Sequence, residues 1–113
     1  MDRLQALKSL IHLRVSLPLA LAHLSEFEWR CDAGLVELEP AHVASVLKKF
    51  VAGALNAAEV ELWANAIAGL EDIRVPEAIT REALHELANP TRTATLTGLR
   101  AQWWLSRLRA FGI

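Results

Sequence analysis

Four histidines and one cysteine are the side chains of this sequence best suited to metal binding or nucleophilic chemistry: His12, His23, His42, His85 and Cys31. A helical zinc site of the protease type needs two histidines four residues apart with a carboxylate between them, and no pair here has that spacing. A reactive thiol needs a lowered pKa. Arg30, next to Cys31, could lower the pKa of its thiol, but Asp32 on the other side opposes that effect. We therefore expect no metal site and an inert thiol.

Other signatures of catalysis or cofactor binding are absent from the sequence. The five glycines are isolated from one another, so none builds a phosphate-binding loop, and no Gly-x-Ser-x-Gly elbow occurs. Neighbouring acids such as Glu71 and Asp72 are typical of solvated loops. The sequence predicts a protein without catalytic residues, cofactor or metal.

The charges are distributed unevenly, although the net charge is only −1. From Glu26 to Glu86 there are twelve acids against five bases, whereas the chain after Glu86 holds four arginines and no acid. A near-zero net charge gives no general reason to expect a nucleic acid or a membrane surface as partner. The distribution predicts an acidic middle and basic ends.

The C-terminal segment combines arginine with tryptophan. Arg100, Trp104 and Arg107 stand at helical contact spacing, which leaves two hypotheses: a nucleic-acid surface, or self-association with the acidic middle of a second copy. Four arginines are few for nucleic acid, and the helix dipole accounts for Arg107 and Arg109, so we favour a homodimer. Because Trp103 and Trp104 point about 100° apart, a core cannot easily take both, and one is predicted to anchor an interface.

A second candidate surface is acidic and lies in the segment 26–39, which is predicted to be mostly irregular. Acidic loops with aromatic side chains can dock onto a basic protein, because charge steers the encounter and the ring fills a pocket. A solvated loop whose aromatic rings close the edge of the core is the alternative. The predicted partner-binding residues are Glu26, Glu28, Trp29, Asp32, Glu37 and Glu39.

Helical periodicity predicts the elements that must position these surfaces. Helices are expected over about 4–15, 17–26, 40–52, 57–68 and 76–88, with a last helix after Thr97; Pro18 separates the first two. Asn56 with Glu59 forms a capping-box pattern, and Thr97 can cap the last helix. The predicted fold is all-α: a compact single-domain bundle of five or six short helices spanning residues 1–113.

Length and composition agree with one domain. The chain has 113 residues, a mass of 12.5 kDa and 53% hydrophobic residues, enough for one core without disulfides. No run of 18 apolar residues occurs, so we expect no membrane span. His12 and Arg14 interrupt the early apolar stretch, which argues against a signal peptide, and a single cysteine fits a reducing compartment. The predicted location is cytoplasmic.

Three stretches carry a resemblance to a group of small bacterial helical proteins of unknown function, over about residues 27–90. The stretches are Gly53-Ala-Leu-Asn56-Ala-Ala-Glu59-Val60-x-x-Trp63-Ala64-Asn65, Gly69-x-Glu71-Asp72-Ile73 and His85-Glu86-Leu87-Ala88-Asn89-Pro90. The first, as Gly-x-Leu-x-Ala-x-Glu-Val-x-x-Trp, is also similar to helical immunity proteins of the colicin type. This resemblance implies a binding role without catalysis, in which an acidic surface covers a basic toxin.

The sequence as a whole predicts a non-enzymatic protein that works through protein–protein contact, in an immunity-like or regulatory role. The alternative function is regulatory binding of nucleic acid through the basic C-terminal helix.

Overall fold

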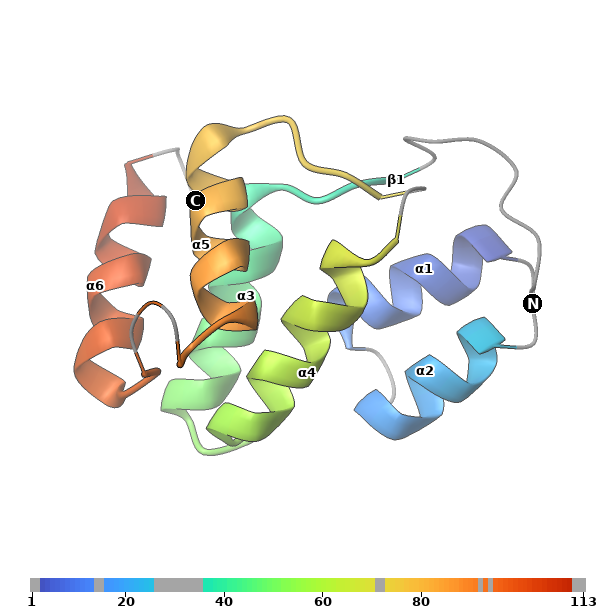
Figure 1. Cartoon of the computed structure of the whole chain (residues 1–113), viewed down its shortest axis with the longest axis horizontal. Coiled ribbons are helices and arrows are strands. Elements are labelled where there is room, and N and C mark those ends of the chain that lie inside the picture. Colours follow the sequence, from blue (N-terminus) through green and yellow to red (C-terminus); the bar gives the residue numbers. More distant parts are fainter. Residues whose placement is uncertain are drawn as a thin grey trace.

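Six helices and one short strand pair make up the part of the chain that the computed structural model describes, which is residues 3–13, 16–25, 36–70, 73–91, 93 and 95–110 (Figure 1). The helices are α1 (Arg3–His12), α2 (Leu17–Ser25), α3 (Pro40–Val51), α4 (Ala57–Ala68), α5 (Ala78–Ala88) and α6 (Gly98–Arg109). The strands β1 (Val36–Glu37) and β2 (Ile73–Arg74) pair in parallel, with Val36 opposite Ile73. The predicted all-α bundle is confirmed, whereas the strand pair was not predicted.

Local signals in the sequence explain most helix boundaries. The side chain of Asn56 accepts the backbone N–H of Glu59 at 2.8 Å, and Glu59 Oε1 accepts the N–H of Asn56 at 3.0 Å, which completes the predicted capping box of α4. Gly53 has a φ of +84°, a left-handed conformation that ends the turn after α3 and that glycine adopts without strain.

The start of α5 differs from the prediction. The helix begins at Ala78 with Glu77 as its N-cap, two residues after the predicted start at Pro76. Arg81 Nη1 donates to the carbonyl oxygens of Val75 and Pro76 at 2.8 and 2.9 Å. These bonds hold Pro76 in the turn that leads from β2 into the helix.

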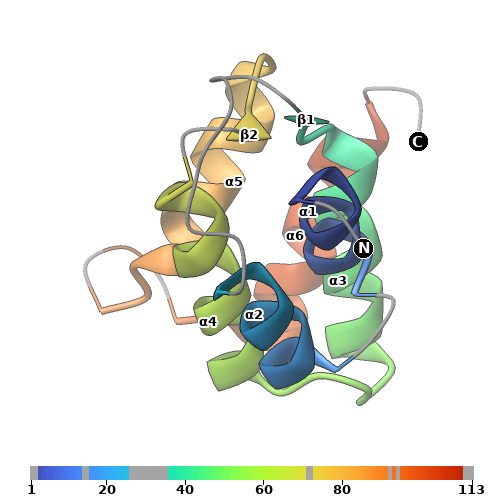
Figure 2. The ribbon, with the colours of Figure 1, turned by 90° about the vertical axis from the view of Figure 1, so that its right-hand side faces the viewer.

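The helices pack around α3, which contacts α1, α4, α5 and α6. α4 pairs with α5, and α1 pairs with α2. Figures 1 and 2 show α6 at one end of the long axis and α1 with α2 at the other. Within the described residues, no helix is long and apolar enough to cross a membrane.

One core joins the helices and includes two polar side chains that are fully buried. Trp63 on α4 is fully buried, and its indole N–H donates to the carbonyl oxygen of Leu10 on α1 at 2.9 Å. Thr80 on α5 is also fully buried, but its hydroxyl has no hydrogen-bond partner among the described atoms. The large, fully buried hydrophobic side chains are Leu7, Leu10, Ile11, Leu38, Val43, Val46, Leu47, Val60, Trp63, Ile67 and Leu108.

Candidate functional site

Helix α6 has one buried side and one exposed side. Its first turn is capped as predicted, because the Thr97 hydroxyl accepts the backbone N–H of Arg100 at 3.1 Å. The helix packs against α3 and α5. Its buried residues are Ala101, Trp104, Leu105 and Leu108. The side chains on the opposite side are therefore free to meet another molecule.

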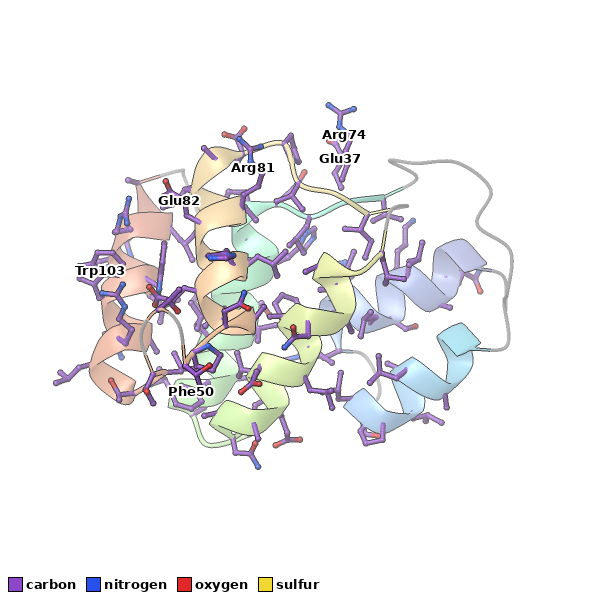
Figure 3. All side chains as sticks on the ribbon, in the orientation of Figure 1. Glu37, Phe50, Arg74, Arg81, Glu82 and Trp103 are labelled. Atoms are coloured by element: carbon purple, nitrogen blue, oxygen red, sulfur yellow. The ribbon has the colours of Figure 1, made fainter. Side chains whose placement is uncertain are left out.

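The adjacent tryptophans of α6 have different environments. Trp104 is 3% exposed and faces the core, whereas Trp103 is 42% exposed and projects from the outer side of the helix (Figure 3). The two rings meet edge to face, with their centroids 4.9 Å apart. The prediction that the core would not take both indoles is confirmed, and Trp103 is the exposed one.

Glu86, on α5, is a buried carboxylate that fixes α6 in place. Arg100 donates to both of its oxygens, from Nε to Oε2 at 2.7 Å and from Nη2 to Oε1 at 2.5 Å. The indole N–H of Trp104 also donates to Oε2, at 2.6 Å. The hydrogen bond from Arg100 is the largest cause that lowers the pKa of Glu86 below its ordinary 4.5; burial opposes it, and Trp104 adds to it. Glu86 is therefore charged near neutral pH and neutralises Arg100.

Two guanidinium groups hold the exposed ring of Trp103. The Cζ atoms of Arg100 and Arg107 lie 3.9 and 4.7 Å from its centroid, within the range of cation–π attraction. Arg107 also lies 3.8 Å from a carboxylate oxygen of Glu82, an exposed pair that contributes little energy. The indole of Trp103 is thus restrained by Arg100, one turn before it on the helix, and by Arg107, one turn after it.

The exposed side of α6 carries two large hydrophobic side chains, Leu99 and Trp103, among arginines and the exposed polar residues Gln102 and Ser106. Leu99 is 86% exposed, and at about 100° per residue it lies only about 40° around the helix from Trp103. Arg107 and Arg109 fall about 80° to either side of Leu99, and α6 contains no acid. We refer to Leu99, Trp103, Arg107 and Arg109 together as the α6 face.

The three residues predicted to bind nucleic acid lie close together, because the Cζ atoms of Arg100 and Arg107 are 5.7 and 5.2 Å from the ring centroid of Trp104, but Trp104 itself is buried. Trp104 is in the core because it shares the helix side of Ala101 and Leu108, and Arg100 is neutralised by a buried carboxylate. The structure instead places Trp103 between Arg100 and Arg107. Of the four predicted residues of α6, Arg100, Trp103 and Arg107 lie together at the surface, and Trp104 lies beneath them.

Only part of the predicted acidic surface can be placed. Glu26, Glu28, Trp29 and Asp32 lie outside the described residues, as does Cys31. Glu37 is exposed on β1, and its register partner is Arg74, so a cation stands beside this acid (Figure 3). Glu39 is the N-cap of α3 and forms a capping box with His42.

His12 of α1 and His42 of α3, which the sequence did not predict to be neighbours, lie in contact. The rings of His12 and His42 are perpendicular, with centroids 4.8 Å apart. His42 Nδ1 accepts the backbone N–H of Glu39 at 2.9 Å. Burial, first, and the neighbouring His12 lower the pKa of His42, while Glu39 opposes them. Within the described ranges, no three His, Cys, Asp or Glu side chains gather as a metal site.

Glu86 is the residue of this site that sequence reasoning missed. A signal for it exists, because Glu86 continues the helical spacing of the buried residues Ile79 and Ala83. A carboxylate on an apolar stripe needs a cation or donors beside it, and in the structure Arg100 and Trp104 of the next helix supply them. The pairing itself depends on how α5 and α6 pack.

A surface groove of about 670 Å³ lies along α3. Its lining is Ala41, Ala44, Ser45, Lys48, Lys49, Ala52 and Ala54. These small side chains and two lysines include no histidine or carboxylate, so the described lining offers no general acid–base pair.

Comparison with known proteins found no matching family model, no similar curated protein and no similar solved structure. The resemblance to colicin-type immunity proteins stays a prediction from the sequence.

Proposed function

We propose that this protein acts without catalysis, by binding another protein through the α6 face. The observation that carries the proposal is the exposed indole of Trp103, held by two guanidinium groups beside the almost fully exposed Leu99. Tryptophan and arginine are enriched among the residues that dominate binding energy at protein interfaces.

The rigidity of this face supports binding. Arg100 is fixed by Glu86, and Arg100 in turn packs against the ring of Trp103. A side chain that is already restrained loses less conformational freedom when a partner arrives, so more of its contact energy appears as affinity.

The charges of the α6 face favour an acidic partner. Arg107 and Arg109 lie beside Leu99 and Trp103, α6 contains no acid, and Glu82 of α5 offsets only Arg107, from 3.8 Å. Cations around an apolar centre steer an acidic protein surface toward it and leave the centre to be desolvated. The expected partner surface is therefore acidic with an apolar centre.

The immunity-like form of this function places the contact on the acidic surface that includes Glu37 and Glu39. The described part of that surface gives it less support than the α6 face has. Both acids are exposed, but the register partner of Glu37 is the cation Arg74, and Glu39 is the N-cap residue of α3.

The test of the proposed function is a binding measurement with Trp103→Ala. Proteins retained by the purified chain from its source cells are identified and expressed, and their affinity for the wild type and the variant is measured. We expect Trp103→Ala to weaken binding at least tenfold, about the effect of removing an interface anchor. Leu19→Ala, at a 45% exposed leucine on α2, is the control and should bind like the wild type. Unchanged affinity in Trp103→Ala would contradict the proposal.

A salt titration decides between this function and nucleic-acid binding. Short labelled DNA and RNA are titrated with the protein at several salt concentrations. A phosphate-binding surface loses affinity steeply as salt rises, with a slope near the number of phosphates contacted. Because Arg100 is already paired with Glu86, we expect no such binding at moderate salt. Tight, steeply salt-dependent binding would favour the alternative function.

A further inference from the structure

A second helix, α4, offers an exposed face whose charge is opposite to that of the α6 face. Leu62 is 50% exposed at its centre, and Ala58, Glu61 and Asn65 are exposed around it. α4 contains Glu59 and Glu61 and no base. We refer to Ala58, Glu61, Leu62 and Asn65 as the α4 face.

The two faces match each other in chemistry. Each has a large exposed hydrophobic side chain at its centre, and the charges of α6 are positive where those of α4 are negative. Asn65 is already fixed, because its amide donates to the carbonyl oxygens of Glu61 and Ala88, both at 3.0 Å. One polar residue of the α4 face is therefore held in place before any partner binds.

We propose that a second copy of this chain is a partner of the α6 face, and that it binds through its α4 face. This inference rests on the proposed function of the α6 face and names one partner for it. Opposite charges at the rim steer the two helices together, and Leu62 covers Leu99 and Trp103. An α6 face against another α6 face would instead pair two positively charged surfaces, without the opposite charge that Glu61 of the α4 face supplies.

This geometry makes the association heterologous, because two different surfaces of the chain meet. α6 lies at one end of the long axis and α4 near its middle, and Trp103 points away from the rest of the molecule (Figures 1 and 3). Each contact then leaves one α4 face and one α6 face unoccupied. Heterologous contacts grow into chains or rings rather than stopping at a two-fold dimer. This differs from the homodimer predicted from the sequence.

The experiment uses two variants that each remove one face. Leu99→Ser with Trp103→Ala removes the α6 face, and Glu61→Arg with Leu62→Ser removes the α4 face. All four side chains are exposed, so both variants should keep the helical circular dichroism of the wild type. Sedimentation from about 10 μM to about 1 mM covers the affinities of small contacts. Leu19→Ser is the control variant.

We expect the wild type and Leu19→Ser to grow beyond a dimer with concentration, and to grow less as salt rises. Each double variant alone should stay monomeric. An equimolar mixture of the two should form a heterodimer and no more, because it holds one intact α4 face and one intact α6 face that can meet.

The inference would be overturned by a wild type that stays monomeric, by a mass that levels off at a dimer, or by a mixture of the two variants that stays monomeric. If the α6 variant loses association but the α4 variant does not, the α6 face binds a surface of the second copy other than its α4 face. The inference then fails, while the proposed function of the α6 face stands. If the α6 variant associates like the wild type, the inference fails, and the affinities of Trp103→Ala for the identified partners decide the function separately.

Discussion

Glu86 links the interior of the molecule to the surface that we propose as its binding site. Its carboxylate receives hydrogen bonds from Arg100 and Trp104, and Arg100 packs against the exposed ring of Trp103. A substitution that alters the carboxylate of Glu86 therefore affects the exposed ring of Trp103 through the side chain of Arg100.

Glu86→Gln should destabilise the fold by about 1.5 kcal/mol, because Arg100 keeps its charge and loses the carboxylate that accepts its hydrogen bonds, while its own side chain stays partly exposed to water. Chemical denaturation measures this loss. Glu82→Gln is the control, since its pair with Arg107 is exposed and long, and its stability should match that of the wild type. A stability of Glu86→Gln equal to that of the control would show that the carboxylate charge has no structural role.

At the residue scale, the sequence predicted that one tryptophan of α6 would be exposed but did not identify which. Helical spacing separates Trp103 from Trp104 by angle alone. The structure decides between them through Leu105 and Leu108, which bury the side of the helix that Trp104 shares. The role of Glu86 was not predicted, because its two partners lie 14 and 18 residues away in the chain.

At the scale of the helices, the boundaries follow local chemistry, so they were largely predictable. The caps at Asn56 and Thr97 involve partners only three residues away. The pairing of β1 with β2 was not predictable in this way, because Val36 and Ile73 meet across two intervening helices and each strand has only two residues. Strands this short carry no local pattern that specifies which segment they pair with.

The cap of α3 makes stability depend on pH. His42 Nδ1 accepts the N–H of Glu39 only while it carries no proton, and protonation would also place a cation beside His12. Because the pKa of His42 is lowered from its ordinary 6.5 in the fold, the unfolded chain binds the proton more tightly. The contribution of neutral His42 to the stability of the fold is therefore fully present above pH 6.5. It is lost as the pH drops from 6.5 toward the lower pKa of His42 in the folded state.

Thermal denaturation at a series of pH values tests this prediction with His42→Gln. Glutamine keeps an acceptor for the Glu39 N–H and does not titrate, so its stability should change less between pH 7 and pH 5 than that of the wild type. The lowered pKa of Glu86 acts in a separate window, since its contribution is lost only as the pH falls below 4.5. Parallel curves for wild type and His42→Gln above that pH would contradict the role of His42.

At the scale of the whole molecule, the N-terminal helices join the rest of the bundle through a few specific contacts. The indole of Trp63 bonds the Leu10 carbonyl across 53 positions of sequence, and Lys49 Nζ donates to the carbonyl oxygen of His12 at 3.1 Å. Apolar stripes in the sequence predicted that Trp63 would be buried. The choice of α1 as its neighbour depends on packing, which no local pattern specifies.

Trp63→Phe should loosen α1 more than the other helices. The ring remains buried, but the Leu10 carbonyl loses its donor, which costs about 1 kcal/mol. Hydrogen exchange should speed up in α1 and stay near the wild-type rate in α5 and α6, since those helices contact α3 without involving this bond. Trp104→Phe is the matched control and should affect α5 and α6 instead. Equal acceleration in all helices would show that α1 unfolds only with the whole protein.

The long reach of Trp63 also has a consequence for synthesis on the ribosome. Leu10 is made 53 residues before the indole that binds it. At about 5–20 residues per second, the nascent α1 waits several seconds for α4, with α2 as an early neighbour. During that interval the apolar side of α1 that packs against α3 in the folded protein has no partner there.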